Sequence, residues 1–440
     1  MFFGNIDLLK IIQPTWYYLL LKNKPATNNF KMIDNYLVLN YCDKYKSKSA
    51  EKLDLNYQKI LNGNFDLDFQ HCDEQVPLID QYTFVRRMFK SVWVYFAFIV
   101  RLATFNNPIK EIKIFLATRH IEKISPEVKL SKNQDFLYFS SKLIKDEPFI
   151  SVIIPTLNRY SHLKNALNDL CNQDYRNFEV IVVDQSEQFD LSFYDSFLLN
   201  KVIIRQKERG LWRARNRAIK KCKGEYLLFY EDDVRVNYDW ISNHLKVLEF
   251  FGCDISVGVF HPKGEKIPNG SRYFRLASQF STGNAMVKKN IFRKVGLFDL
   301  QFEKMRMGDG EFGARCVKND IIMINNPFAS CIDVKATQGG FREIGSWDGY
   351  RSKSFFGPKP FPSVIYFYRK YWGKKSAIIT LVKLVPLTLV PYSIKNKKFA
   401  YIISVVLFFL FFPILFYKAL ISWSIASKML NEGHKISSLE

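Results

Sequence analysis

From Pro148 onward, short apolar runs alternate with polar stretches of helical spacing. The apolar runs have the length of buried strands, and they cover residues 148–156, 178–186, 202–206, 225–233 and 254–260. Apolar residues recur at helical intervals in the stretches between them, over residues 161–173, 212–222 and 240–251. Uninterrupted apolar strands separated by helices are typical of a parallel sheet covered on both faces. The pattern therefore predicts an α/β domain over residues 147–345, with a mostly parallel, doubly wound sheet.

The preceding region, residues 1–146, has a different texture. It mixes Tyr, Phe, Asn and Lys without a motif that indicates chemistry, and we assign it no role. Within it, residues 84–105 space basic residues through an aromatic-rich helical pattern. This pattern fits a helix on a membrane surface, and it fits a core helix with a basic edge equally well.

The last part of the chain is strongly apolar. Residues 399–417 contain no charge, and lysines flank them on both sides. At about 1.5 Å per residue, such a stretch nearly crosses a hydrocarbon core of about 30 Å. We predict a transmembrane helix over 399–421, followed by a short tail, 422–440. Lys383, Pro386 and Pro391 interrupt the preceding apolar stretch, so residues 346–398 are predicted to be an extension with an interfacial or re-entrant helix.

Charge narrows the possible partners. The chain has 64 Lys and Arg against 42 Asp and Glu, a net charge of +22. This excess suits nucleic acid, an anionic membrane or a phosphate-bearing substrate. No zinc module or aromatic RNA-binding strand is present, so a nucleic acid partner is not expected. The 7 cysteines are scattered without a CxxC pair, which predicts free thiols in a reducing compartment. The N-terminal sequence lacks the basic stretch and cleavage site of a secretory signal.

Polar side chains follow three of the predicted strands at the point where each ends. The strand ends carry Pro155, Thr156, Asn158 and Arg159 (first), Asp184 (second), and Glu231, Asp232 and Asp233 (fourth). In open α/β sheets, ligands bind outside the carboxyl ends of the strands. We therefore expect these groups to converge on one binding edge. Three adjacent carboxylates repel one another unless a cation lies among them.

The nucleotide motifs that would explain such an edge differently are missing. Neither a Walker-type loop nor a GxGxxG sequence follows the first strand. The remaining possibility is a nucleotide that strand-end side chains hold, with its diphosphate neutralised by a metal and by arginines. Carboxylate oxygens suit Mg²⁺ or Mn²⁺. Arg209, Gly210, Arg213 and Arg215 lie at or near the start of the helix before the acidic strand, where guanidinium groups could bind phosphate. Arg213 could equally well only decorate the helix.

The motifs together resemble those of the family 2 glycosyltransferases, which have the GT-A fold. The resemblance rests on the order and spacing of SVIIPTLNR, VIVVDQS, RGLWRARNRAIKKCKGEYLLFYEDD, STGNAMVKKNIFRKVGLFD and GDGEFGAR, between residues 148 and 345. It implies an inverting transfer of a sugar from a UDP- or GDP-sugar to a hydroxyl of a lipid-linked or saccharide acceptor. Because sugar nucleotides are cytosolic, the catalytic domain is expected on the cytoplasmic side of the cell membrane.

The resemblance also implies roles for individual residues. Pro155 through Arg159 and Asp184 would hold the base and ribose, Asp232 or Glu231 would approach the ribose, and Asp233 would bind the metal. Arg215 and Asn216 match the family's Arg-Asn pair beside the donor. Gly283 and Asn284 match a loop on the acceptor side. Related enzymes often carry a His in the segment 331–343, where Asp333 stands here, so Asp333 is a candidate second metal ligand.

Inversion requires a carboxylate that takes the proton of the acceptor hydroxyl on the face opposite the leaving diphosphate. The resemblance assigns this task to Asp309 in MGDGEFGAR (307–315). The Glu that usually precedes this Asp is replaced by Gly308, so Glu311 is a second candidate. Either acid could instead only stabilise the start of a helix.

Two other functions fit parts of the pattern. A nucleotidyltransferase acting on a sugar phosphate also uses a parallel sheet, carboxylates and Mg²⁺, but it would need a glycine-rich loop that TLNRYSHLK lacks. A catalytically silent membrane scaffold with this fold would be expected to have lost its acids. Asp184, Asp233 and Asp309 are all present.

Overall fold

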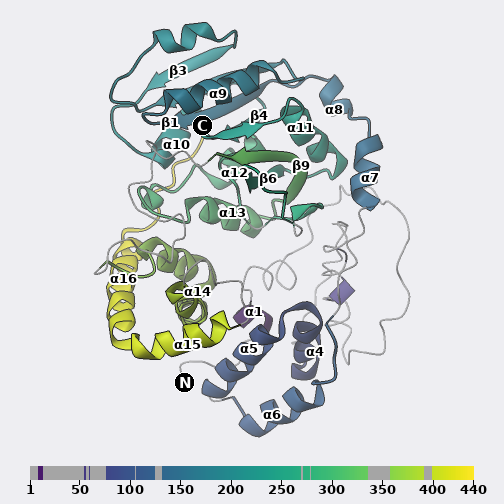
Figure 1. Ribbon diagram of the computed structural model, residues 1–440, viewed down its shortest axis with the longest axis vertical. Coiled ribbons are helices and arrows are strands. Elements are labelled where there is room, and N and C mark those ends of the chain that lie inside the picture. The colour runs from purple at the N-terminus through teal and green to yellow at the C-terminus, as the bar shows by residue number, and fades with distance from the viewer. Residues whose placement is uncertain are drawn as a thin grey trace. The chain divides into compact units, whose positions relative to one another are not determined.

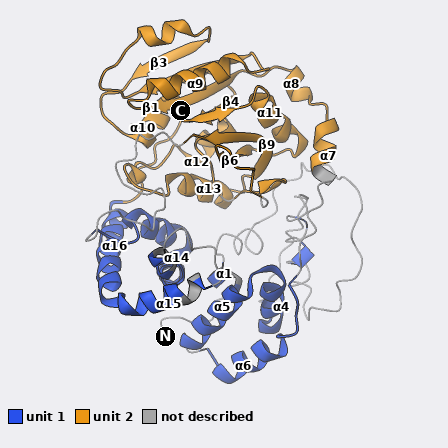
Figure 2. Ribbon diagram, in the orientation of Figure 1, with its two compact units in different colours: residues 1–127, 348–432 blue, residues 128–347, 433–440 orange. Residues whose placement is uncertain are grey.

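The computed structural model describes residues 8–12, 54–55, 59, 76–104, 106–123, 131–268, 271–277, 279–334, 357–390 and 399–440. The chain forms two compact units, shown in Figure 2. Unit 1 comprises residues 1–127 and 348–432, and unit 2 comprises residues 128–347 and 433–440. Unit 2 includes the predicted α/β domain.

The first half of the sheet in unit 2 is parallel. The sheet runs in the order β3-β2-β1-β4-β8-β6-β9-β5, with β7 paired to β9. Its parallel strands are β1 (Ile150–Thr156), β2 (Phe178–Asp184), β3 (Lys201–Arg205) and β4 (Tyr226–Tyr230). Thr156 lies opposite Asp184 in the register of β1 and β2. The carboxyl ends of these strands therefore lie side by side, as the sequence predicts.

The second half of the sheet is mixed, where we expected mostly parallel strands. β8 (Asn284–Lys288) pairs antiparallel with β4 and with β6 (Ile255–Pro262). β9 (Met323–Asp333) runs parallel to β6 and antiparallel to β5 (Val234–Val236) and β7 (Arg275–Leu276). The predicted α/β fold class is confirmed, with a parallel first half and a mixed second half.

Helices cover this sheet because each presents one apolar face to it (Figure 1). In α9 (Tyr160–Cys171) the buried apolar residues are Leu163, Ala166, Leu167 and Leu170, at helical spacing. α10 (Leu211–Lys221) packs on β1 and β2, and α11 (Trp240–Phe250) packs on β6 and β9. The remaining helical segments of unit 2 are α7 (Ser131–Tyr138), α8 (Lys142–Lys145), η1 (Ser192–Ser196), α12 (Asn290–Val295), η3 (Leu300–Phe302) and α13 (Gly308–Lys318).

The segment 433–440 belongs to unit 2 although it follows a helix of unit 1. Its backbone pairs with the segment that leads into α13: Leu297 N donates to Ser437 O at 2.9 Å, and Leu300 N donates to Lys435 O at 3.2 Å. Gly296, with φ of 81°, faces Ile436, whose Cγ2 would lie 2.5 Å from an added Cβ. A glycine therefore meets both the positive φ and the close contact.

In unit 1, the helices α1 (Leu8–Ile12), α4 (Leu78–Met88), α5 (Ser91–Ala103) and α6 (Pro108–Ala117) pack together. The predicted helix over 84–105 is two helices with a break at residues 89–90. Buried Glu111 accepts from Arg101 Nε at 2.7 Å and from Tyr82 Oη at 3.0 Å, so the charge inside this bundle is paired. Arg101 is buried, which favours the interpretation of this region as core.

The C-terminal part of unit 1 consists of α14 (Pro362–Leu384), η5 (Pro386–Leu389), α15 (Ala400–Leu410) and α16 (Phe412–Glu432). Within the described ranges, no single helix is long and apolar enough to cross a membrane, but α15 and α16 reach the required length together, as a pair bent by 80°. The predicted straight helix over 399–421 is thus broken at Phe411. Pro413 explains the break, because it lacks the N–H that would bond the carbonyl of Phe409 in a continuous helix.

Candidate active site

The ends of β1 and β4 are joined by their side chains. Thr156 Oγ1 donates to Asp232 Oδ2 at 2.7 Å. Arg159 Nη1 lies 3.0 Å from Asp232 Oδ1 and 3.0 Å from Asp233 Oδ2. Pro155, Thr156, Arg159 and the two aspartates are all buried. The structure therefore brings the first-strand and fourth-strand predictions together, with one guanidinium held between two carboxylates.

Two acids at this edge, Glu231 and Asp232, are in an environment that disfavours their ionised forms. Burial raises the pKa of Glu231 to about 6; Arg215 opposes this shift, and the charges of Asp233 and Asp232 add to it. Burial likewise raises the pKa of Asp232, against the effect of Arg159. Additional positive charge at the edge would stabilise the ionised forms.

Asp184, at the end of β2, is fully buried, and its carboxylate accepts hydrogen bonds from neighbouring residues. Its Oδ2 accepts from Tyr160 Oη at 2.7 Å and from Tyr194 Oη at 2.8 Å, and its Oδ1 accepts from Ser186 N at 2.8 Å. It therefore anchors the loop after β2 and η1. Its predicted contact with a nucleotide base stays a prediction.

Asn158 connects the loops after β1 and β2. Its backbone has a φ of 55°, in the left-handed region that Asn tolerates better than most residues. Its N–H donates to Ser186 Oγ at 2.9 Å, and its Oδ1 accepts from Glu187 N at 3.0 Å. Asn158 thus fixes the shape of the edge beside Asp184.

The start of α10 is occupied by a carboxylate. Arg213 N donates to Glu303 Oε2 at 2.9 Å, and Gly210 N donates to Gln185 Oε1 at 2.7 Å. A Cβ on Gly210 would lie 3.0 Å from the Glu303 carboxyl carbon, so glycine admits this contact. A negative group at a helix N-terminus is favourable. The side chain of Arg209 pairs with Glu187.

Arg215 and Asn216 follow one another on α10 but do different things. Arg215 is buried, and its Nη2 donates to Glu231 Oε1 and to Thr282 O, each at 3.1 Å. Its Nε and Nη1 have no hydrogen-bond partner among the described residues. Asn216 instead uses both ends of its amide on the backbone of Phe298, at 2.9 Å each. Arg215 therefore faces the acidic triplet, whereas Asn216 holds the backbone at Phe298.

Gly283 and Asn284, the predicted acceptor-side pair, also differ from each other in what they contact. A Cβ on Gly283 would lie 2.7 Å from the Glu231 carboxyl carbon, so this glycine makes room for the acid. The side chain of Asn284 is fully buried beneath the site. Its Oδ1 lies 2.9 Å from both Trp240 Nε1 and His244 Nε2, and its Nδ2 donates to Ala329 O at 2.9 Å. Asn284 therefore supports the sheet from within.

Asp309 lies in the first turn of α13 and is partly exposed. Its Oδ2 accepts from Gln279 Nε2 at 2.7 Å, and its Oδ1 accepts from Gly310 N at 2.8 Å. The charges of Glu231 and Asp309 both act on Arg215 and raise its pKa against the larger, lowering effect of burial. One guanidinium thus lies within electrostatic reach of the donor-side acid and the predicted base.

The replacement of the usual Glu by Gly308 has a steric reason. A Cβ at Gly308 would lie 2.3 Å from Cζ2 of Trp212. The indole is fixed in place, because Trp212 Nε1 donates to Phe302 O at 3.0 Å. A larger residue therefore cannot occupy position 308 while Trp212 keeps this place.

Glu311, the second candidate base, is fully buried. Its Oε2 accepts from Arg315 Nη2 at 3.0 Å, and Arg315 Nη1 in turn donates to Val295 O and Leu297 O. This carboxylate therefore has no exposed surface for an acceptor hydroxyl, and the geometry favours Asp309.

Asp333 ends β9, opposite Val234 in the register of β5 and β9. Glu231, Asp333 and Asp233 lie near enough to Cys331 that their charges add to the effect of burial, which raises the pKa of its thiol. The two predicted metal ligands thus share one neighbourhood. In the described part of the chain, no group of three or more His, Cys, Asp or Glu side chains has the geometry to hold a metal ion.

The sequence reasoning missed several residues of this site. Tyr160 and Tyr194 bind Asp184, Glu303 caps α10, and Gln279 binds Asp309. Only Tyr160 gave a usable signal, since it follows Asn158 and Arg159 directly. The others come from η1 and from loops, whose positions depend on the folded chain.

The sheet, its polar carboxyl edge and the acid at the start of α13 define a glycosyltransferase domain of the GT-A type. A comparison with family models matches residues 151–306 to glycosyl transferase family 2. These residues belong to glycosyltransferase family 2, as the sequence motifs predicted.

Each of two matched relatives aligns with about a third of the chain. Glycosyltransferase GlyA of Streptococcus pneumoniae is 27% identical over 164 residues, 36% of this chain and 22% of the relative. Glycosyltransferase AglE of Haloferax volcanii is 26% identical over 161 residues, 34% of this chain and 52% of the relative. The match thus spans about a fifth to a half of the length of these relatives.

Two solved structures overlap more of the chain at lower identity. Staphylococcus aureus TarS 1–349 in complex with UDP-GlcNAc has a TM-score of 0.43 and 18% identity, covering 61% of this chain and 79% of TarS. The mannosyltransferase PcManGT of Pyrobaculum calidifontis, in complex with GDP-Man and Mn²⁺, has a TM-score of 0.42 and 17% identity, covering 67% of this chain and 92% of that protein.

Proposed function

We propose that the protein is an inverting glycosyltransferase that moves a sugar from a UDP- or GDP-sugar to a hydroxyl of a lipid-linked or saccharide acceptor. The family of residues 151–306 supports glycosyl transfer. The observation that carries the finer proposal is Arg215, which binds Glu231 and is coupled electrostatically to Asp309. The positive charge of Arg215 beside those two acids suits an anionic diphosphate.

Asp309 is the proposed base because it is the acid near Arg215 that keeps exposed surface on α13. The hydrogen bond from Gln279 leaves carboxylate lone pairs available for an acceptor hydroxyl. As the hydroxyl oxygen bonds to the sugar carbon, Asp309 accepts its proton and the bond to the diphosphate breaks on the opposite face. Arg215 lies where it can stabilise the negative charge of the departing diphosphate.

We propose that Asp233 and Asp333, with Glu231 nearby, hold a divalent cation, Mn²⁺ or Mg²⁺. The support is chemical, because carboxylate oxygens are the ligands that these cations prefer, and Asp233, Asp333 and Glu231 all act electrostatically on Cys331. When bound, such a cation would neutralise charge on the diphosphate. Arg159, which bridges Asp232 and Asp233, would orient the ligand carboxylate.

Replacing Asp309 with Asn tests the base. We expect kcat for sugar transfer to fall by about 10²–10⁴-fold, since Asn cannot take a proton. Donor binding, measured by titration calorimetry with UDP- and GDP-sugars, should change little. Asp174→Asn is a matched control, because Asp174 accepts one side-chain hydrogen bond from Ser242 on the surface of the same unit. Transfer at the normal rate by the Asp309 variant would exclude it as the base.

Replacing Asp233 with Asn tests the cation site without relying on turnover. We expect Mn²⁺ to strengthen the binding of UDP or GDP to the wild-type protein, and this gain to fall at least about tenfold in the variant. Calorimetric titrations with and without Mn²⁺ measure the gain, and Asp174→Asn should keep it. An unchanged gain would assign the cation to other ligands.

We further propose that unit 1 contacts the cytoplasmic face of the cell membrane. The support is an exposed apolar surface on α15 and α16, where Phe409 is 71% and Leu410 70% exposed. Because sugar nucleotides are cytosolic, this side would bring the donor and a lipid-linked acceptor to one enzyme. Flotation of the full chain with lipid vesicles tests the contact.

A further inference from the structure

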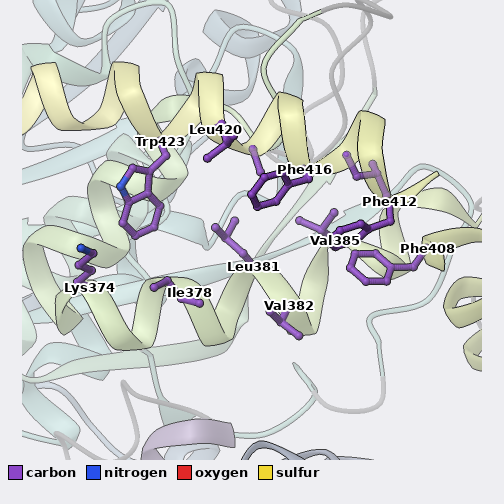
Figure 3. Close-up of a pocket in the computed structure, with 12 residues that line it drawn as sticks. Lys374, Ile378, Leu381, Val382, Val385, Phe408, Phe412, Phe416, Leu420 and Trp423 are labelled. Carbon is purple, nitrogen blue, oxygen red and sulfur yellow. The ribbon is translucent and has the colours of Figure 1, made fainter. Parts of the chain in front are cut away.

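A groove in unit 1 has no part in the proposed chemistry. It encloses about 360 Å³ between α14, α15 and α16, and Figure 3 shows its lining. α14 lines one side and α16 the other, with apolar side chains that include Ile378, Leu381, Val385, Phe412, Phe416 and Leu420. We call it the α14–α16 groove. Its surface favours a hydrocarbon occupant.

The groove differs at its two ends. Lys374 and Trp423 lie at one end in Figure 3, and Phe408 and Phe412 lie at the other. Lys374 is the one charged residue among those that line the groove, and it is exposed. Gly373, with φ of 82°, breaks α14 directly before Lys374, which a residue with a side chain would resist. The shape and charge therefore fit an apolar chain with an anionic group at one end.

A second positive charge, that of Arg369, lies near Trp423 at the Lys374 end of the groove. The Arg369 guanidinium lies 4.4 Å from the ring centroid of Trp423 and donates to Ser427 Oγ at 2.6 Å. The cation–π contact holds the indole beside Lys374. An indole with one apolar and one polar edge is well suited to the boundary between hydrocarbon and head group.

The apolar side of the groove continues onto the exposed surface of unit 1. Phe416 lines the groove and is 52% exposed, and Phe409, outside the lining, is 71% exposed. A hydrocarbon chain could therefore enter from a membrane against α15 and α16. A soluble anionic metabolite would leave this apolar surface uncovered.

We propose that the α14–α16 groove binds a hydrocarbon chain of an anionic membrane lipid, with the lipid phosphate at Lys374. This site rests on the proposed membrane contact and is independent of glycosyl transfer. It gives unit 1 a preference for anionic lipid that an apolar surface alone would not have.

Quenching of Trp423 by brominated lipid chains tests the proposal with the full chain. The probes are vesicles of brominated phosphatidylglycerol and of brominated phosphatidylcholine. We expect stronger quenching by phosphatidylglycerol, and loss of that difference in Trp423→Phe. In Lys374→Gln, half-maximal quenching should need about fivefold more phosphatidylglycerol, the effect of one lysine near an anionic surface.

Two further variants separate the groove from the exposed surface. Ala419→Phe fills the groove, so it should reduce quenching of Trp423 while the protein still floats with vesicles. Phe409→Ser weakens flotation but should leave quenching intact in the protein that binds. Circular dichroism checks that each variant is folded.

The outcomes distinguish the two proposals. Flotation without quenching of Trp423 contradicts the lipid site alone and points to another segment of the chain in the groove. Equal quenching by both lipids contradicts the anionic head group. Failure to float with either vesicle contradicts the membrane contact and the lipid site together, whereas loss of sugar transfer bears on neither.

Discussion

Residue 308 is constrained by a side chain from another helix. Trp212 fills the space in which a side chain at 308 would lie, and its indole is fixed by Phe302 O. The centroid of the same ring lies 5.1 Å from the Arg215 guanidinium carbon, so one indole is next to both Arg215 and the start of α13. A single tryptophan therefore accounts for the unusual GDGE sequence.

Gly308→Ala should destabilise unit 2 by about 1–3 kcal/mol, the usual effect of inserting a methyl group into a packed site. Thermal unfolding measures the change. Gly310→Ala is the control, since its Cβ would meet only the end of Met307, at 3.3 Å, and Ala favours a helix. Trp212→Leu combined with Gly308→Ala should recover part of the loss. Equal stability of the two single variants would mean that Trp212 moves aside freely.

At the scale of elements, a buried polar network joins one helix to three strands beneath the site. His244 of α11 lies 2.8 Å from Ser256 Oγ of β6 and 2.9 Å from Asn284 Oδ1 of β8, and Asn326 of β9 donates to Ser256. Asn284 Oδ1 is an acceptor, so His244 Nε2 carries the proton and Nδ1 accepts from Ser256. The network needs a neutral imidazole.

Burial lowers the pKa of His244 to about 4 from 6.5. Between these values the unfolded chain binds the proton more tightly than the folded one, so stability falls as pH drops below 6.5. We expect this group to remove about 1.6 kcal/mol between pH 6.5 and 5. Chemical denaturation of wild type and His244→Phe across this range measures it. Identical pH slopes in both proteins would refute the buried neutral state.

These elements also separate what the sequence could predict from what it could not. Strands β1 to β4 and helices α9 to α11 were predicted close to their bounds, because their apolar pattern is local. The pairing of β8 against β4 has no local signal, since it depends on segments far apart in the chain. Pro413 is a local signal against a continuous membrane helix, and the prediction over residues 399–421 did not take it into account.

The candidate site likewise contains residues whose position the sequence could predict and residues whose position it could not. Thr156, Arg159 and Asp233 could be placed together because strand ends share an edge. The burial of Asn284 and Glu311 could not be predicted, since it depends on partners from other elements, such as Trp240 for Asn284. Spacing alone indicates which residues lie near an edge, and packing decides which of them face a ligand.

At the scale of the whole molecule, the proposed membrane contact has two possible contributions, the net charge of +22 and the apolar surface of α15 and α16. The two contributions respond differently to salt. Attraction between basic residues and anionic lipid is screened beyond about 10 Å at 0.1 M salt and about 3 Å at 1 M. Burial of apolar side chains in a membrane is not weakened in this way.

We therefore expect binding of the full chain to anionic vesicles to weaken at least about tenfold between 0.1 M and 1 M salt, as several lysines and arginines lose about 1 kcal/mol each. Binding to zwitterionic vesicles should change little, and Phe409→Ser should weaken it at every salt concentration. Vesicle flotation at graded NaCl measures both. Binding to anionic vesicles that ignores salt would mean that the apolar surface alone holds the protein, and that its positive charge serves the phosphate-bearing donor.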